Sequence, residues 1–276
     1  MRPVGQVEMC RLLGIVASEP TEFRLALREA PRSLAALSRE HRDGWGLAVW
    51  GDDSAWRIDK GVACAQEDER FHELAGERGE LLVAHIRQRT VGCTSLENTH
   101  PFQSGRWIFA HNGTIKDVEF LRASTSAMRK AEIRGETDSE LFFAYLLSRL
   151  DAAGLTAAVP GLETDAVLRQ AIRDVRARPD FGACNFLLSD SICTYAHRFG
   201  RSLFLLERGP TDKVRVNRES SEGVVVQTPW SQQRYAVLVA SERMTDEPWE
   251  ELSEGMLLRI DRFPLPRWRL VDAVAA

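Results

Sequence analysis

Residues 10–18 read CRLLGIVAS, a mostly apolar run that contains Gly14 and predicts a buried strand. Cys10 stands at the head of this run, directly after Met9. If translation starts at Met9 and that residue is removed, Cys10 becomes the N-terminal residue. A free α-amino group has a pKa of about 7.7–8.0, so it can act as a base toward the thiol of its own residue. The alternative interpretation of Cys10 is a small buried residue at the start of a strand.

In the rest of the chain, the pattern of apolar and polar residues predicts strands in both halves and helices between and around them. Helices are expected over 22–40, with an interruption at Pro31, and over 66–78, 137–154 and 162–178. Strands are expected over 43–51, 56–62, 80–87, 106–113, 183–190 and 191–199, and in the stretches SLFLLER, GVVVQT, RYAVLVAS and MLLRIDR. Hairpin connections between most of these strands predict an α+β fold, with two antiparallel sheets and the helices outside them.

Composition excludes several classes of protein. The chain has 276 residues, a net charge of −4, 44% hydrophobic and 28% charged residues, which is typical of a soluble globular protein. No stretch approaches the ~20 apolar residues of a membrane-spanning helix. Five cysteines without a CxxC pair argue against a disulfide framework and a zinc site, and they favour the reducing cytoplasm. We therefore expect Cys64, Cys93, Cys184 and Cys193 to be core thiols, and no metal or cofactor.

Four motifs downstream of Cys10 carry residue types that could serve chemistry. HIRQRT (85–90) places Arg87 at the end of a predicted buried strand, where a guanidinium could hold a carboxylate by two parallel hydrogen bonds. NTHP (98–101) offers His100 in a loop. HNG (111–113) could supply an oxyanion hole from the Asn112 side chain and the Gly113 N–H, or simply form a hairpin turn.

The fourth motif is ETDSE (136–140), at the start of a predicted helix. Thr137 or Asp138 is expected to cap that helix, with Glu140 placed for a capping box, and Asp138 could instead bind an ammonium group. Together the motifs offer a nucleophile, an oxyanion hole, a carboxylate clamp and an ammonium acceptor. That set suits an amino acid with a scissile side-chain amide, which means glutamine or another γ-glutamyl amide.

The ordered set of motifs resembles the class II glutamine amidotransferases of the N-terminal nucleophile hydrolase superfamily. The matching pieces are Met9-Cys10, DGWGLA (43–48), HIRQRT, NTHPF (98–102), HNGTI (111–115) and ETDSE. The C-terminal pieces NFLLSD (185–190), YAHRFG (195–200) and VASERMTDEPWEEL (239–252) are similar to the standalone branch, which includes γ-glutamyl hydrolases of ergothioneine and glutathione metabolism. The resemblance covers about residues 10–262 and implies a four-layer αββα sandwich.

The resemblance also implies a role for each matching residue. Cys10 would attack the γ-carbonyl with its own α-amino group as base, and Asn112 and Gly113 would hold the oxyanion. Arg87 would bind the substrate α-carboxylate and Asp138 the α-ammonium, while His100 and Thr90 would line the pocket. The family has Trp and His where this chain has Gln88 and Val91, so the loop over the substrate departs from the family pattern.

The domain organisation follows from the same comparison with the family. Residues 10–276 are expected to form a single amidotransferase-type domain, with residues 1–9 a leader that is absent or removed in the active form. No synthase half and no Walker A pattern is seen, so the chain would hydrolyse a γ-glutamyl amide alone or deliver ammonia to a separate synthase subunit. A non-catalytic binding protein of the same fold is the third interpretation.

Two further features are assigned to ordinary structure. The basic stretch within 197–218 also contains acidic residues, and we interpret it as solvated surface rather than a nucleic-acid site. Trp45 and Trp249 are expected either to pack in the core or to form walls of the pocket.

Overall fold

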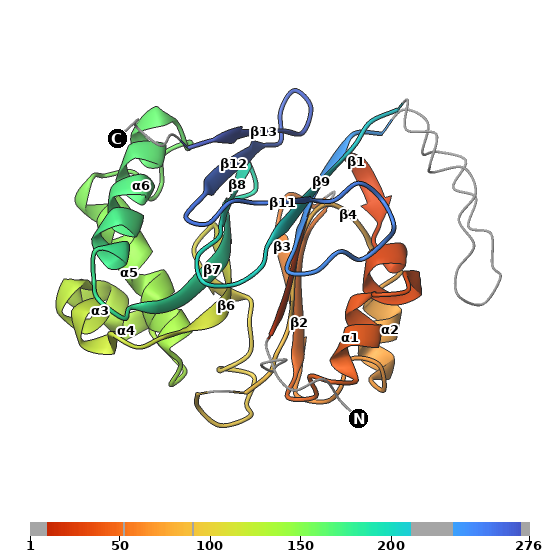
Figure 1. Ribbon diagram of the computed structural model, residues 1–276, viewed down its shortest axis with the longest axis horizontal. Coiled ribbons are helices and arrows are strands. Elements are labelled where there is room, and N and C mark those ends of the chain that lie inside the picture. The colour runs from red at the N-terminus through yellow and green to blue at the C-terminus, as the bar shows by residue number, and fades with distance from the viewer. Residues whose placement is uncertain (1–9, 52, 90, 211–233, 272–276) are drawn as a thin grey trace.

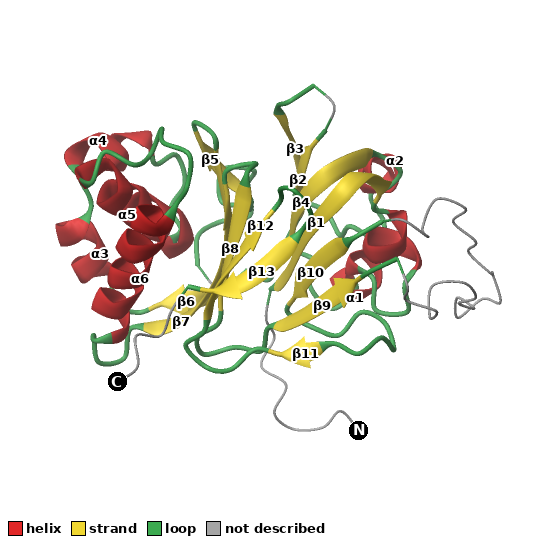
Figure 2. Ribbon diagram, turned by 90° about the horizontal axis from the view of Figure 1, so that it is seen from above, coloured by secondary structure: helices red, strands yellow, loops and turns green. Residues whose placement is uncertain are grey.

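Two antiparallel sheets stand face to face at the centre of the computed structural model, and helices cover the outer face of each (Figure 1 and Figure 2). The structure describes residues 10–51, 53–89, 91–210 and 234–271. This arrangement is the four-layer αββα sandwich, so the predicted fold class is confirmed. Strand GVVVQT (223–228) lies outside the described residues.

The first sheet contains the strand that begins after Cys10 near its centre. Its strands in spatial order are β11 (Glu250–Glu251), β9 (Phe204–Arg208), β10 (Ala236–Ala240), β1 (Arg11–Glu22), β4 (Arg78–Ile86), β2 (Trp45–Trp50) and β3 (Trp56–Gly61). The second sheet follows the order β13 (Arg267–Leu270), β12 (Leu257–Asp261), β8 (Cys193–His197), β7 (Gly182–Ser189), β6 (Trp107–Ile115) and β5 (Phe102–Ser104).

Each sheet has its own group of helices. The first sheet is covered by the π-helical turn η1 (Leu25–Glu29), α1 (Leu34–Ser38) and α2 (Glu69–Leu74), and the second by α3 (Val118–Ser124), α4 (Ala127–Glu132), α5 (Asp138–Ala152) and α6 (Leu162–Arg176) (Figure 1). The helix start at 137–140 forms as expected, because the Thr137 side chain accepts a hydrogen bond from the N–H of Glu140. The Glu140 carboxylate reaches further back than a capping box would, to the N–H groups of Arg134 and Gly135.

Side chains alternate between the two faces of each sheet, and the apolar ones form three separate layers. In β1, Leu13 and Ile15 face the helices of the first sheet, while Leu12 and Val16 face the second sheet. In β6, Phe109 packs against α5 and Ala110 faces the first sheet. Since side chains on a strand alternate between faces, Cys10, two residues before Leu12, points into the space between the sheets.

The expected helix over 22–40 is only partly formed: residues 24–29 and 34–38 are helical, with the predicted interruption at Pro31, but Glu22 belongs to β1. Strand β1 continues through Thr21 and Glu22, which pair with Gly79 and Arg78 of β4 after a break in register. Only short helical turns follow, on either side of Pro31. Pairing with β4 fixes the backbone of 21–22, and this tertiary contact overrides the helical pattern of the local sequence.

Gly46 lies where the first sheet meets the turn that carries His100. A Cβ atom added at Gly46 would lie 1.9 Å from the His100 carbonyl oxygen and 3.0 Å from Cδ of Pro101. We therefore expect Gly46→Ala to lower the free energy of unfolding by about 2–3 kcal/mol, because backbone atoms must move to admit the methyl group. Thermal and urea unfolding measure this change. Gly161→Ala is the matched control, since nothing lies within 4 Å of its added Cβ; equal stability of the two variants would contradict the close approach.

Candidate active site

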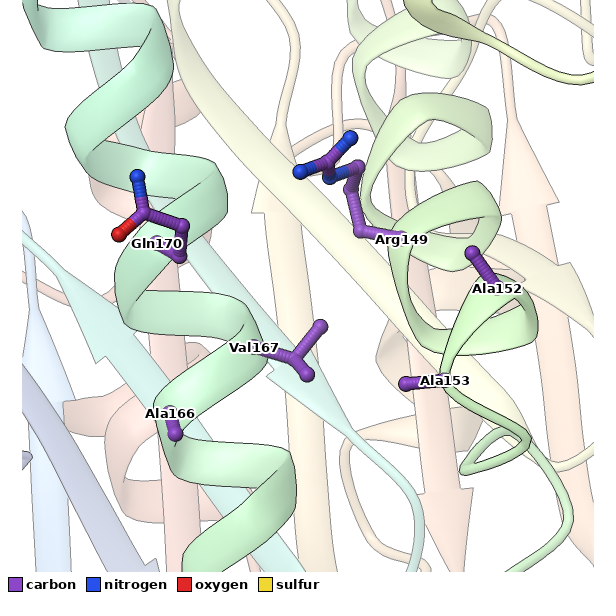
Figure 3. Close-up of a pocket in the computed structure, with 6 residues that line it drawn as sticks. All are labelled: Arg149, Ala152, Ala153, Ala166, Val167 and Gln170. Atoms are coloured by element: carbon purple, nitrogen blue, oxygen red, sulfur yellow. The ribbon is translucent and has the colours of Figure 1, made fainter.

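Two hollows differ in their chemistry. The larger is an open groove between α5 and α6, lined by Arg149, Ala152, Ala153, Ala166, Val167 and Gln170 (Figure 3). Its walls are mostly small and apolar, and they bring no nucleophile or acid–base pair together. The smaller pocket lies at the end of the inter-sheet layer and is lined by Cys10, Arg87, Gln88, Val91, Asn98, His100, His111, Gly113, Thr137, Asp138 and Ser139. Its residue types make the smaller pocket the candidate active site.

Cys10 sits at the wall of this pocket, held by the backbone N–H and carbonyl of Gln88. Its Sγ is 3.3 Å from the carbonyl oxygen of Gln88 and accepts a hydrogen bond from the Gln88 N–H at 3.2 Å. Burial raises the pKa of the Cys10 thiol, while the Gln88 peptide and the positive charges of Arg87 and Arg11 oppose that rise. The thiol is therefore the resting form, and the groups that would stabilise the thiolate are already in place.

Arg87 follows the end of β4 and brings an incompletely paired guanidinium to the pocket. Nη2 donates to the carbonyl of Val91 at 3.0 Å. Nη1 is buried, with no hydrogen-bond partner among the residues that the structure describes. A buried guanidinium nitrogen without an acceptor is costly in an empty protein and suits an anionic ligand.

Asp138 reaches the pocket from the first turn of α5. Its Oδ2 accepts a hydrogen bond of 2.5 Å from the N–H of Ile115 at the end of β6, and 8% of the residue is exposed. This contact fixes the helix start against the strand that carries the HNG motif. The pocket thus has a cationic group from β4 and an anionic group from α5 on its wall.

Gly113 lines the pocket from β6, while its neighbour Asn112 is buried in the strand opposite Asn185. A Cβ at Gly113 would lie 1.9 Å from the carbonyl oxygen of Ala183, so only glycine fits at this point of the sheet. Alternation places the Asn112 side chain on the inter-sheet face of β6, the face toward which Cys10 points.

His111 is held in one tautomer. Its Nε2 lies 3.1 Å from the carbonyl oxygen of Ala183, which can only accept, so Nε2 carries the proton. Nδ1 then accepts from the hydroxyl of Ser139, at 2.8 Å. Burial lowers the pKa of His111, with the Asp138 charge acting in the opposite direction. The neutral ring therefore has both nitrogens engaged, one with Ser139 of α5 and the other with Ala183 of β7.

His100 lies against a second buried histidine. The ring centroids of His85 and His100 are 4.2 Å apart. Burial lowers the pKa of His85 to about 3 and that of His100 well below its usual value, and His111 adds to the lowering at both rings. Neither nitrogen of the His100 ring has a hydrogen-bond partner within the described part of the chain, whereas the His85 ring interacts with the backbone of His111. Both rings are neutral at physiological pH and are weak bases.

The pocket contains most, though not all, of the residues that the sequence singled out. Cys10, Arg87, His100, Gly113 and Asp138 all line it. Asn112 is adjacent without lining it, and Thr90 lies outside the described residues.

Several pocket residues were missed by sequence reasoning. Asn98 donates to the Cys93 carbonyl at 3.0 Å and accepts from the Glu136 N–H at 2.7 Å, so it joins the loop before β5 to the segment that leads into α5. Its position within NTHP was the available signal. The roles of Ser139 and of the Gln88 peptide depend on contacts between strands and carry no local sequence signal.

The structure corrects one expectation, about the cysteines, and decides another, about the two tryptophans. Cys93 is exposed on the loop after Arg87, so its assignment to the core was wrong, whereas Cys64, Cys184 and Cys193 are buried as expected. Both tryptophans pack in the core: Trp45 donates from Nε1 to Asp68 at 2.8 Å, and Trp249 donates to Thr245 at 3.1 Å.

The basic stretch within 197–218 is described as far as residue 210. Arg198 bridges to Glu251 at 2.8 Å, and Arg208 bridges to Glu247 at 2.7 Å. Side-chain exposure is 19% for Arg198, 20% for Arg208 and 2% for Glu247, so both arginines are mostly covered and lie in ion pairs rather than on a solvated surface. Across the described ranges, no cluster of three or more His, Cys, Asp or Glu side chains could hold a metal ion. Within those ranges, too, every helix is too short or too polar to cross a bilayer.

A cysteine placed before a central strand, in a four-layer αββα sandwich, is the arrangement of the N-terminal nucleophile hydrolase fold. The chain belongs to the class II glutamine amidotransferases, whose family model matches residues 9–263.

Individual relatives agree with this membership. The chain is 28% identical over 262 residues to the uncharacterized protein MJ1515 of Methanocaldococcus jannaschii, covering 91% of this chain and 68% of that one. It is also 28% identical over 212 residues to the gamma-glutamyl-hercynylcysteine sulfoxide hydrolase of Mycobacterium tuberculosis, covering 72% and 81% of the two chains. A solved structure titled as a predicted glutamine amidotransferase from Pseudomonas aeruginosa matches with a TM-score of 0.60 and 26% identity, covering 92% of this chain and 98% of that one.

Proposed function

We propose that this protein hydrolyses glutamine or another γ-glutamyl amide through a thioester on Cys10. The observation that carries the proposal is the convergence of Cys10, Arg87, Gly113 and Asp138 on one small pocket. The Arg87 guanidinium would bind the α-carboxylate of the substrate and Asp138 its α-ammonium group. With the head of the amino acid held in this way, the side-chain amide points to the sulfur.

The reaction would take place in two steps. The Cys10 sulfur attacks the γ-carbonyl carbon, and the negative charge that forms on oxygen is stabilised by the Gly113 N–H and the Asn112 side chain. The C–N bond then breaks, the amine leaves with a proton, and a γ-glutamyl thioester remains. Water attacks the thioester, releases glutamate and restores the thiol.

The choice of base follows from the state of the histidines. His111 is neutral with both ring nitrogens engaged, and burial lowers the pKa of His100 well below its usual value. The hydrogen bonds of the Cys10 sulfur to described residues are both with the Gln88 backbone. These facts favour the α-amino group of Cys10 as the base, as in the family. That group is free only if residues 1–9 are absent or removed, which we propose for the active form.

A substrate panel tests the proposal directly. Glutamine, glutathione and γ-glutamyl conjugates of thiol-histidines are each incubated with the protein, and released glutamate is measured while intact mass reports the first residue. We expect turnover of a γ-glutamyl compound by protein that begins at Cys10. Full activity with residues 1–9 still attached would contradict the proposed base. Weak turnover that a separate synthase subunit stimulates would instead assign the chain to ammonia delivery.

A further inference from the structure

The sulfur of Cys10 is held by the backbone of Gln88, which contacts it through the N–H of the Arg87–Gln88 peptide and the carbonyl of the Gln88–Arg89 peptide. The Gln88 N–H is 3.2 Å from Sγ and the carbonyl oxygen is 3.3 Å from it. The thiol can donate to the carbonyl, whereas a thiolate can only accept from the N–H. The backbone conformation of Gln88, which orients both peptide groups, therefore affects how easily the sulfur loses its proton and where it points.

The Gln88 backbone is fixed from the other side by residues 41–44. The N–H of Arg87 donates to the carbonyl of Gly44 at 2.8 Å, and the N–H of Asp43 donates to the carbonyl of Arg87 at 3.3 Å. The N–H of Arg89 donates to Oδ2 of Asp43 at 2.9 Å. The backbone is thus held on both sides of Gln88.

His41 supplies the contact to Gln88 itself. Its Nδ1 lies 3.2 Å from Oε1 of the Gln88 side chain, and 2% of His41 is exposed. Because that oxygen can only accept, Nδ1 carries the proton in this contact. The bond joins residues 47 positions apart in the sequence and depends on Gln88, the residue at which this chain departs from the family tryptophan.

We propose that His41 is a positioning residue which, by holding the Gln88 side chain, orients the Gln88 backbone against the sulfur of Cys10. The proposal rests on the proposed function in that Cys10 is taken as the nucleophile. His41 does not line the pocket, so its route to the sulfur is the contact with Gln88. Arg87 and Arg11 provide the positive charges near the sulfur, and neither is changed by the variants below.

The test compares variants that remove or keep the contact. His41→Leu and Gln88→Met remove it, whereas His41→Asn keeps a donor at the position of Nδ1. All are made in a Cys93→Ser background, because Cys93 is exposed and would also react with the probe. The rate of Cys10 alkylation by iodoacetamide is measured from about pH 6 to about pH 10, a range that extends to both sides of the usual pKa of a cysteine thiol. Circular dichroism checks that each variant is folded.

We expect His41→Leu and Gln88→Met each to slow alkylation at pH 7.5 by about 10-fold and to move its pH profile to higher pH. His41→Asn should stay within about 2-fold of the parent, and the double variant should be no slower than either single one. In turnover assays kcat should fall while KM changes little, because neither residue is placed on the substrate head. An unchanged alkylation profile in His41→Leu or in Gln88→Met would overturn the proposal. Alkylation is independent of turnover, so failure of the substrate panel would leave this result standing.

Discussion

Cys10→Ala is expected to abolish release of glutamate from the best γ-glutamyl substrate, with a loss of at least ~10⁴-fold in kcat. The reason is chemical: without the sulfur no thioester forms, and the hydroxyl groups of Thr137 and Ser139, which also line the pocket, are engaged with the Glu140 N–H and the His111 ring. Steady-state assays of glutamate release measure the loss. Stability should change little, since the removed atom contacts only the Gln88 backbone and the pocket.

Cys93→Ser is the matched control for that result. It removes a thiol that is exposed and lies on the loop beside the pocket, and we expect it to keep activity within about 2-fold. Equal loss in both variants would indicate damage to the loop rather than removal of a nucleophile. Turnover that survives in Cys10→Ala would assign the chemistry to another residue, or the protein to the class of binding proteins that share this fold.

Arg87→Lys is expected to raise KM by about 10- to 100-fold and to change kcat much less. A lysine keeps the positive charge but offers one ammonium in place of a planar fork, so the two parallel hydrogen bonds to a carboxylate are lost. Since the α-carboxylate is far from the scissile bond, the same binding energy is lost in the ground state and in the transition state. Initial-rate measurements over a range of substrate concentrations separate KM from kcat.

Arg42→Lys provides the comparison for Arg87→Lys. Arg42 pairs with Glu67 at 2.6 Å on the surface, and more than half of its side chain is exposed. An exposed pair contributes little to stability, so KM and stability should both remain close to those of the parent. If Arg87→Lys leaves KM unchanged, Arg87 does not bind the substrate carboxylate.

Much of the fold could be predicted because the strands that build the two central layers are long, apolar and alternating. Strands β4, β6 and β7 lie within two residues of their predicted limits, and so does α5. The elements that were missed are short or depend on neighbours. Helices α3 and α4 each span less than two turns and are defined by their caps, Asp117 and Ser126. Strand β5 is three residues long and exists only through its pairing with β6.

The candidate site could be predicted where the type of a single residue within a short motif indicates its chemistry. Cys10, Arg87, Gly113 and Asp138 stand in motifs whose residue types suggest a role, and all line the pocket. The contacts that hold them in place could not be predicted. The bond between Ile115 and Asp138 and that between His41 and Gln88 join segments 23 and 47 residues apart, so they require the three-dimensional register of strands and helices.

The position of the pocket across two sheets has a mechanical consequence. The sulfur belongs to a residue next to β1, whereas Gly113 belongs to β6 of the opposite sheet. The distance between the sulfur and the oxyanion hole that we propose at Gly113 is therefore set by how the two sheets pack on one another, as where Leu187 of β7 fills the space above Gly14 of β1. A methyl group gained or lost in that layer, far from the proposed reacting atoms, would shift one half of the proposed site relative to the other. Turnover would then fall at a misalignment of the sheets that is still too small to lower the melting temperature.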